Sequence, residues 1–243
     1  MREEDKLECL VCAKYMEPLT KDSKDFYQCP ACKHTFINYT GNGLDYHKSD
    51  YRNNGCGTRT NDEIVDSKFT DEFHKARKGI CQNRFEFIKK YIEGRSTLLD
   101  IGAGGGTFAS MLKDRTSLKI DCQEISDVCY SNLVNYGFNS HHGDFCSIDF
   151  GKQFDIVTCW HVLEHIKDLS SFSNKAAEVC SDLLIVEVPI NRQLRDPKEG
   201  WDGHYHYFSE VSLSELFKNN FYLINIKEGV QSPAIFAVFQ RRH

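Results

Sequence analysis

Residues 98–108 carry the chemical pattern with the clearest meaning in this chain. Apolar residues that end at Ile101 run into three glycines at alternate positions, Gly102, Gly104 and Gly106. Glycine has no Cβ, so the backbone N–H groups of such a turn can approach a bound ligand closely, and the helix that follows presents further N–H groups. The pattern predicts a strand, a turn and a helix start that bind a nucleotide-like cofactor.

Acidic residues accompany this turn at the ends of three predicted strands. Asp100 lies at the end of the first strand, and Glu124 follows the second, where a carboxylate can accept hydrogen bonds from both ribose hydroxyls. Asp144 and Phe145 follow the third strand, where a carboxylate can accept a hydrogen bond from an adenine amino group. Taken alone, Asp144 also fits a plain turn, and Phe145 also fits a plain core position.

Two cysteine pairs near the N-terminus form a second chemical pattern. Cys9 and Cys12, and then Cys29 and Cys32, have the C-x-x-C spacing with sixteen residues between the pairs. This spacing predicts a zinc ribbon whose four thiolates hold a structural zinc ion, because four protein ligands leave no open position. A redox role for the pairs is the alternative, and His34 is an alternative ligand. So short a segment cannot bury a core of its own, so we expect the metal to supply much of its folding free energy.

Strands and helices must alternate along the chain to position these residues. This alternation predicts an α/β fold with a doubly wound, mostly parallel, seven-stranded sheet, closed by an antiparallel pair. The expected strands are 97–101, 118–122, a short one near 141, 154–160, 183–188, 222–227 and 234–240. The expected helices are 69–91, 108–113, 127–136, 169–180 and 209–217.

The segment 154–166 reads Phe-Asp-Ile-Val-Thr-Cys-Trp-His-Val-Leu-Glu-His-Ile. With the glycine turn and the acidic strand ends, it resembles the class I S-adenosylmethionine-dependent methyltransferases, in the small-molecule branch whose fourth strand ends in an HVLEH segment. The resemblance covers about residues 70–240. The alternate glycines depart from the dinucleotide-binding spacing, which favours a methyltransferase over a dehydrogenase. The resemblance implies a Rossmann-like methyltransferase fold with S-adenosylmethionine as cofactor.

The resemblance also implies a role for each residue of the cofactor site. Asp100 would orient the turn and the methionine amino group, Glu124 would hold the ribose, and Cys159 would offer its carbonyl to the ammonium group. The glycines would let the backbone approach the methionine part, and the two residues after the third strand would hold the adenine. The implied cofactor-binding residues are Asp100, Gly102, Gly104, Gly106, Glu124, Asp144, Phe145 and Cys159.

Four histidines are candidates for a general base, because an acceptor hydroxyl must lose a proton and histidine titrates near neutral pH. His161 and His165 would share a face if their stretch were helical, and they could then also hold a metal ion. A backbone hydrogen bond is the alternative role for His165. His204 and His206 follow the polar loop 191–203, and we expect one of them to contact the acceptor.

Three parts of the chain differ in composition. We expect residues 1–40 to be the zinc-ribbon module, residues 41–68 to be a connector or an active-site lid, and residues 69–243 to be the methyltransferase domain. The lid alternative rests on the tyrosines of the Gly- and Asn-rich middle part.

Overall composition limits the partners of the protein. The 30 basic and 35 acidic residues give a net charge of −5, which argues against a broad nucleic-acid interface. No apolar run approaches the ~20 residues of a membrane helix, and no signal peptide is visible, so we expect no membrane partner. Eleven cysteines in a chain without export features predict reduced thiols and a cytoplasmic location.

Three functions fit these patterns. The leading prediction is methyl transfer to a hydroxyl of a small molecule (a sugar, a phosphorylated sugar or a natural-product intermediate), with the zinc ribbon shaping the acceptor site. The alternative is an RNA- or protein-modifying methyltransferase that docks through the ribbon, and salt-sensitive binding would mark it. A non-enzymatic protein that keeps the cofactor pocket is the third possibility. The sequence does not predict the oligomeric state.

Overall fold

The computed structural model describes residues 7–19, 26–38, 71–190, 203–229 and 233–243. In the helix that begins at Asp71, side chains are described from residue 77 onward. The predicted connector or lid at 41–68, and residues 191–202 of the polar loop, lie outside the described residues. The chain divides into two compact units. We name them the glycine-turn unit and the cysteine unit.

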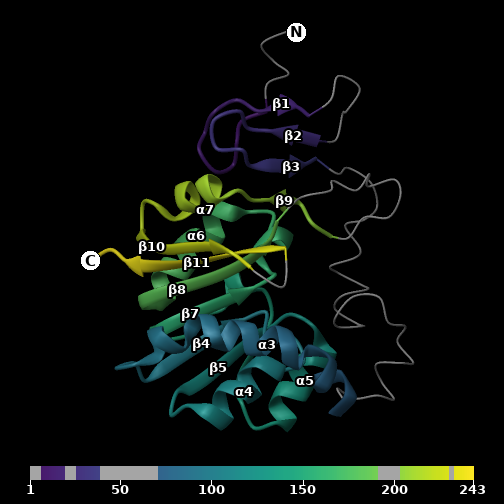
Figure 1. The fold of residues 1–243 in the computed structure, drawn as a ribbon, viewed down its shortest axis with the longest axis vertical. Coiled ribbons are helices and arrows are strands. Elements are labelled where there is room, and N and C mark those ends of the chain that lie inside the picture. Colours follow the sequence, from purple (N-terminus) through teal and green to yellow (C-terminus); the bar gives the residue numbers. More distant parts are fainter. Residues whose placement is uncertain (1–6, 20–25, 39–70, 191–202, 230–232) are drawn as a thin grey trace. The chain divides into compact units, whose positions relative to one another are not determined.

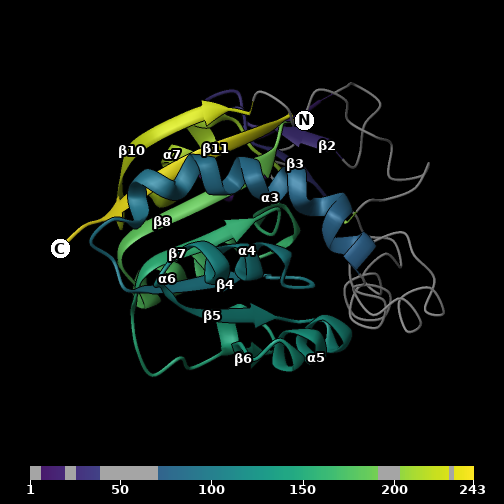
Figure 2. The same ribbon diagram turned by 60° about the horizontal axis from the view of Figure 1, so that its bottom comes forward.

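The glycine-turn unit comprises the described parts of residues 44–159 and 178–183. Parallel pairing joins β4 to β5 and to β7, and β5 to β6. Figure 2 shows β4, β5 and β6 beside one another in that order. The elements are α3 (Asp71–Ile92), β4 (Thr97–Ile101), α4 (Thr107–Arg115), β5 (Lys119–Glu124), α5 (Asp127–Asn135), β6 (Asn139–His142), the 3-10 helix η3 (Phe145–Ser147) and β7 (Phe154–Trp160).

The cysteine unit comprises the described parts of residues 1–43, 160–177 and 184–243. Its N-terminal strands are β1 (Glu17–Pro18), β2 (Phe26–Gln28) and β3 (Thr35–Ile37). The later elements are the 3-10 helix η4 (Leu163–His165), most of α6 (Leu169–Val179), most of β8 (Cys180–Pro189), β9 (His206–Tyr207), α7 (Glu210–Phe217), β10 (Phe221–Glu228) and β11 (Ala234–Arg241).

A small antiparallel sheet joins the two ends of the cysteine unit. Its strand order is β1-β2-β3-β9, so β9, which belongs to the C-terminal part of the chain, extends the sheet of the N-terminal segment (Figure 1). Thr35 pairs with Tyr207, and Phe36 pairs with His206. The predicted zinc-ribbon segment therefore shares its sheet with residues far along the chain.

The main sheet has seven strands in the order β10-β11-β8-β7-β4-β5-β6. The pairs around β4 and β5 are parallel, whereas β10 and β11 form an antiparallel pair. This confirms the predicted α/β fold with a mostly parallel seven-stranded sheet. Residues 183–188 of β8 are all buried, as the nearly continuous apolar run predicts.

Local sequence signals account for several element boundaries. Ser209 caps α7 by accepting a hydrogen bond from Ser212 N–H, as its serine at this position predicts. Ser126 caps α5 in the same way through Cys129 N–H. The stretch through His161 and His165, for which a helix was only considered, forms the 3-10 turn η4.

No helix within the described residues is both long enough and apolar enough to cross a membrane.

Candidate functional site

The glycine turn after β4 is held by the side chains that end β5. Gly102, Gly104 and Gly106 all have positive φ values of 62°, 55° and 79°, a conformation that glycine adopts without strain. Gly104 N–H donates to Oε2 of Glu124 at 2.7 Å, and Gly102 N–H donates to Oε1 of Gln123 at 3.1 Å. The turn therefore keeps its backbone donors aligned through two neighbouring side chains of β5.

Among the acidic residues that the structure describes in the glycine-turn unit, Glu124 is the most buried, with 0% of its surface exposed. Its other oxygen, Oε1, accepts from the backbone N–H groups of Ile125 and Ser126 at 2.8 and 2.9 Å. Burial raises the pKa of Glu124, although these N–H donors act in the opposite direction. Sequence analysis predicts ribose binding here, and the structure places the carboxylate directly against the glycine turn.

Asp100 and Cys159 lie on neighbouring parallel strands. Asp100 is 1% exposed, and its Oδ1 accepts a hydrogen bond from Thr158 Oγ1 at 2.7 Å. Cys159 is fully buried and pairs with Ile101, one residue before the glycine turn. The structure thus brings both residues to the end of β4 and β7, within the same unit as the turn.

Asp144 and Phe145 occupy the start of η3. Asp144 is exposed and accepts a hydrogen bond from Cys146 N–H at 2.9 Å, which makes it the N-cap of this 3-10 helix. Phe145 is 3% exposed and packs against Phe150 with ring centroids 5.9 Å apart. Asp144 thus makes the contacts of a turn residue, and Phe145 makes those of a core residue, which are the alternatives considered for them. Adenine binding by the two residues stays a prediction.

His161 follows β7 directly and lies between two buried carboxylates of the cysteine unit. Its Nδ1 lies 3.1 Å from Oε1 of Glu164, and its Nε2 lies 3.5 Å from Oε1 of Glu187. The two glutamates are 0% and 1% exposed. Its φ of 55° is uncommon for a residue with a side chain, and its backbone N–H donates to Glu187 O at 2.9 Å.

The charge of His161 follows from this position. Burial opposes a charge on the imidazole, but the hydrogen bonds and negative charges of Glu164 and Glu187 outweigh it and raise the pKa of His161 to about 9. Burial acts to raise the pKa of Glu164, but the hydrogen bond from His161 and the electrostatic contributions of His165, His161 and His204 together lower it. A protonated imidazole cannot accept a proton, so the geometry argues against His161 as the general base at neutral pH.

His165 and His204 lie beside the same buried glutamate. Their rings meet edge to face with centroids 4.7 Å apart, and His204 meets Tyr207 in the same way at 5.7 Å. His165 Nδ1 lies 2.9 Å from the carbonyl oxygen of Gly203, which confirms the backbone hydrogen bond considered for it. Oε2 of Glu164 has no hydrogen-bond partner among the described residues.

This group also contains potential metal ligands. Glu164, His165 and His204 each offer one ligand atom, and these atoms lie within 4.8 Å of one another. The condition under which His161 and His165 would share a helical face is not met, because η4 spans only residues 163–165 and the left-handed backbone at His161 precedes it.

His206 is fully buried and contacts the N-terminal segment that carries the four clustered cysteines. Its Nδ1 lies 3.1 Å from Nε2 of His34, which is also 0% exposed, and its ring stacks on Phe36 with centroids 5.4 Å apart. Burial lowers the pKa of His34 to about 3 and that of His206 to about 4, so both rings are neutral at physiological pH. The structure gives His206 a packing role and does not support the acceptor contact predicted for it.

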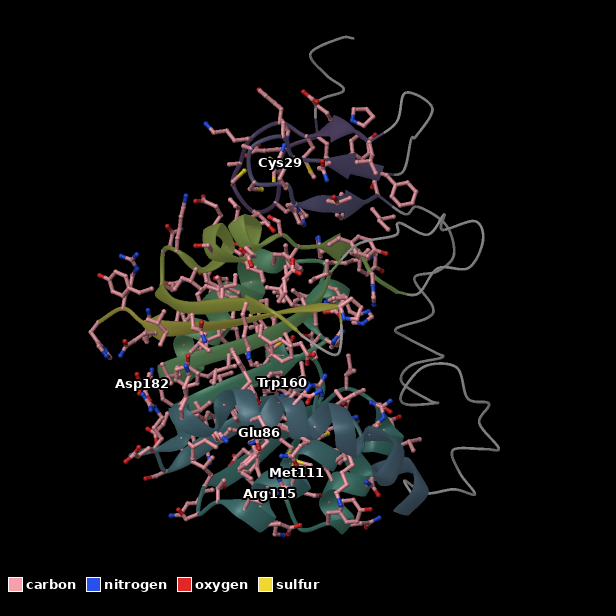
Figure 3. All side chains as sticks on the ribbon, in the orientation of Figure 1. Cys29, Glu86, Met111, Arg115, Trp160 and Asp182 are labelled. Carbon is pink, nitrogen blue, oxygen red and sulfur yellow. The ribbon has the colours of Figure 1, made fainter. Side chains whose placement is uncertain are left out.

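The four N-terminal cysteines form one compact cluster. Their sulfur atoms lie within 4.8 Å of one another, with Cys9 and Cys32 at 3.6 Å and Cys12 and Cys29 at 3.5 Å. Figure 3 shows the labelled Cys29 beside other sulfur atoms. A tetrahedral zinc ion with Zn–S bonds of ~2.3 Å separates its sulfur ligands by about 3.8 Å. The donor set and its spacing therefore fit tetrahedral zinc.

The protonation of these thiols depends on burial and on the knuckle backbone. Burial raises the pKa of Cys9 to about 11, although the backbone N–H groups of Val11 and Cys12 oppose it. At Cys29 burial acts in the same direction, but the backbone N–H groups of Cys32 and Ala31 and the side-chain hydrogen bonds with Cys12 and Cys32 together lower the pKa. A bound cation would remove these thiol protons, because the thiolate is the metal ligand.

Sequence analysis missed Glu187 and Gln123. Glu187 is a charged residue inside the apolar run of β8, which is a usable signal, because a buried charge needs a partner. Gln123 precedes Glu124 and links the turn to the next strand, since its Nε2 donates to Gly143 O at 2.6 Å. The sequence carries no comparable signal for Gln123.

Comparisons with known proteins agree with this geometry. Residues 73–224 match a family model described as a methyltransferase domain. The chain is 30% identical over 106 residues to a ubiquinone biosynthesis O-methyltransferase of Hydrogenovibrio crunogenus, and the match covers 39% of this chain and 43% of the relative. The chain therefore matches less than half the length of that relative.

Solved structures share the fold at low sequence identity. The PH0226 protein of Pyrococcus horikoshii OT3 superposes with a TM-score of 0.61 at 16% identity, covering 76% of this chain and 100% of that one. A chain of the complex between the Haloferax volcanii Trm112 methyltransferase activator and a methyltransferase gives 0.62 at 13% identity, covering 77% and 100%. Magnesium protoporphyrin IX methyltransferase of Synechocystis PCC 6803, solved with bound S-adenosylhomocysteine, gives 0.53 at 14% identity, covering 82% and 94%.

The family model covers more than half of the chain, and the fold, the alternate glycines and the buried acidic strand end agree with it. The chain therefore belongs to the class I S-adenosylmethionine-dependent methyltransferases.

Proposed function

We propose that this methyltransferase transfers the methyl group of S-adenosylmethionine to a hydroxyl group of a small molecule. The O-methyltransferase name of the curated relative supports this acceptor chemistry. The observation that carries the proposal is the buried Glu164 carboxylate surrounded by His161, His165 and His204, because such a group can orient and charge-stabilise a general base.

On the cofactor side, we assign binding to the glycine turn and the acidic residues around it. The Glu124 carboxylate would accept hydrogen bonds from the ribose hydroxyls, and the backbone of the turn would face the methionine part. Asp100, held by Thr158, would orient the turn. The proposed cofactor-binding residues remain Asp100, Gly102, Gly104, Gly106, Glu124, Asp144, Phe145 and Cys159.

On the acceptor side, we assign the general base to His204. S-adenosylmethionine supplies an activated methyl group and its own leaving group, so the protein has to align the hydroxyl and accept its proton. His204 would take that proton as the new C–O bond forms and the C–S bond breaks. Glu164 would stabilise the resulting imidazolium, and His165, fixed by Gly203 O, would limit the movement of the His204 ring.

We also propose that the cysteine cluster holds one structural zinc ion. Four buried or half-buried sulfur atoms at tetrahedral spacing support this assignment. Strand β9 extends the sheet of the N-terminal cysteine segment. Tyr205, just before β9, links this segment to η4, because Ile37 N–H donates to Tyr205 O at 2.9 Å and Tyr205 N–H donates to Glu164 O at 2.8 Å. The zinc-loaded segment would in this way support the strand that follows His204.

The acceptor can be found directly. The purified full-length protein is incubated with methyl-tritiated S-adenosylmethionine and with fractions of a small-molecule cell extract, alongside a panel of sugars, phosphorylated sugars and phenols. Label in a small molecule supports the proposal. Treatment of the product with alkali, followed by mass spectrometry, then locates the methylated oxygen. Label that appears only in RNA or protein fractions, or on nitrogen or carbon, overturns it.

A further inference from the structure

The two cysteine knuckles of the N-terminal segment repeat the same backbone geometry. In the first, Ala13 N–H donates to Cys9 O at 2.9 Å, and Cys9 N–H donates to Lys14 O at 2.7 Å. Both bonds recur at 2.9 Å in the second, twenty positions later, among Cys29, Lys33 and His34. Ala13 and its counterpart both have positive φ, at 57° and 60°. Lys14 and His34 therefore hold equivalent positions after the two knuckles.

The side chains at these equivalent positions differ in burial. Lys14 is exposed, as expected for a residue that follows a surface knuckle. His34 is 0% exposed, and its Nδ1 lies 3.7 Å from Sγ of Cys9, a ligand of the opposite knuckle. Its other ring nitrogen, Nε2, lies 3.1 Å from Nδ1 of His206 on β9. One imidazole thus links the cysteine cluster to a residue 172 positions along the chain.

Metal binding fixes the direction of these contacts. A metal-bound thiolate has no proton, so it can only accept a hydrogen bond. The contact between Cys9 and His34 is attractive only when Nδ1 of His34 carries the proton. Nε2 of His34 lies 3.1 Å from Nδ1 of His206, and this hydrogen bond holds the His34 ring in the orientation that its contact with Cys9 requires.

We propose that His34 is an outer-shell residue of the cysteine metal site, donating a hydrogen bond to the Cys9 thiolate, and that His206 orients it from outside the zinc-ribbon segment. This inference rests on the proposed zinc site. Hydrogen bonds to metal ligands fix their orientation and offset the charge on sulfur, and removing such a partner typically weakens metal binding by about 10- to 100-fold. Strand β9 would therefore contribute to metal affinity without supplying a ligand.

Neighbouring contacts place His206 firmly. Its ring contacts those of Phe36 and Phe208, with centroids 5.4 and 5.9 Å away, and its strand pairs with β3. Ser209 Oγ also donates to Cys32 O at 2.7 Å, so the start of α7 bonds directly to the second knuckle. These contacts leave the pair of imidazoles little freedom to separate.

The test measures zinc affinity of the full-length protein by competition with a chromophoric chelator, and the absorption spectrum after cobalt(II) substitution. His34→Phe should weaken zinc binding about 10- to 100-fold and shift the sulfur-to-cobalt charge-transfer bands. His206→Phe leaves every residue of the N-terminal cysteine segment unchanged. It should also weaken zinc binding, by a smaller factor than His34→Phe. His34→Asn, which keeps an N–H donor near the position of Nδ1, should restore part of the affinity.

The matched control is Thr35→Val. Thr35 follows His34 in the chain and is buried on β3, and its hydroxyl accepts a hydrogen bond from Gln28, so the zinc affinity of Thr35→Val should equal that of the wild type. Equal affinity in the His34→Phe variant would overturn the inference while leaving the zinc site intact. A wild-type chain that binds no zinc would overturn both.

A second measurement decides the question if the His34 variants do not fold. Nitrogen-15 NMR of the zinc-loaded wild type reports which ring nitrogen carries the proton. A protonated Nδ1 on His34 supports the inference. An unprotonated Nδ1 on His34 overturns it, because the ring would then present a lone pair to the thiolate.

Discussion

Gly104 and Glu124 are joined by a charge-assisted hydrogen bond of 2.7 Å between the backbone N–H of the turn and the carboxylate that ends β5. This bond connects the two features that define the cofactor side of the protein, and it lies wholly within the glycine-turn unit. The carboxylate also accepts two further backbone N–H groups, so one side chain both shapes the turn and remains the proposed ribose ligand.

Replacing Glu124 tests this dual role. In Glu124→Gln the amide nitrogen cannot accept hydrogen bonds, so at least one charge-assisted bond of about 1.5–3 kcal/mol is lost. S-adenosylhomocysteine should then bind about 10- to 100-fold more weakly by titration calorimetry. The control is Glu86→Gln on the exposed face of α3, which should keep the wild-type affinity. Wild-type affinity in Glu124→Gln would contradict the assignment.

Gly106 is a glycine of the turn at which a side chain would clash with its surroundings. Its φ is +79°, and a Cβ would lie 2.8 Å from Cδ2 of Leu133 on α5. Gly106→Ala should therefore lower the free energy of unfolding by about 1–3 kcal/mol in denaturant melts. Gly79, inside α3, has open space around it, so Gly79→Ala should raise the stability by about 0.5–1 kcal/mol. Equal effects of the two substitutions would argue against a conformational requirement at Gly106.

The protonated His161 should stabilise the folded protein at neutral pH, and this stabilisation should be lost at alkaline pH. Its pKa is about 9 in the folded protein and near 6.5 when unfolded, so its ionic contribution is complete below about pH 6.5. The contribution is lost as pH rises through about 9, because the folded state then releases the proton that it holds more tightly.

Denaturant melts of the wild type and His161→Gln at a series of pH values measure this effect. The stability difference between them should be largest in mild acid and should shrink toward alkaline pH. His243→Gln, at the exposed C-terminus, should show no such trend. A constant difference for His161→Gln across the range would show that the two glutamates do not hold its proton.

The base assignment predicts a selective loss in His204→Ala. A general base contributes typically about 10²–10⁴ to the rate, so kcat should fall by about that factor while the affinity for S-adenosylhomocysteine is retained. Activity should recover partly at higher pH, where the acceptor hydroxyl ionises by itself. His243→Ala serves as the matched histidine control. An unchanged kcat in His204→Ala would remove His204 as the base.

Metal analysis tests the cysteine cluster. The purified protein should contain about one zinc ion per chain, and removal by a strong chelator should lower its melting temperature. Cys12→Ser should lose the zinc because one of four thiolates is missing. Cys146→Ser, at a half-buried cysteine of η3 outside the cluster, should retain it. Equal zinc content in the two variants would contradict the assignment of Cys12 as a ligand.

The local parts of this protein could be predicted from the chain alone. The strand at 97–101, the glycine turn and the N-cap at Ser209 depend on backbone conformation and on neighbours a few residues away, and the structure has them as expected. The two C-x-x-C pairs have a spacing that few structures other than a metal site explain, and their sulfur atoms do converge.

The grouping of the histidines was decided by tertiary structure. His161 depends on Glu187, which sequence analysis placed in an apolar strand, and His206 depends on His34, 172 positions away. Periodicity and spacing report contacts within one element, whereas these pairs form because β8 and β9 bring distant segments together. Burial then set their chemistry, since the same residue type holds a proton at His161 between two carboxylates and stays neutral at His206 among aromatic rings.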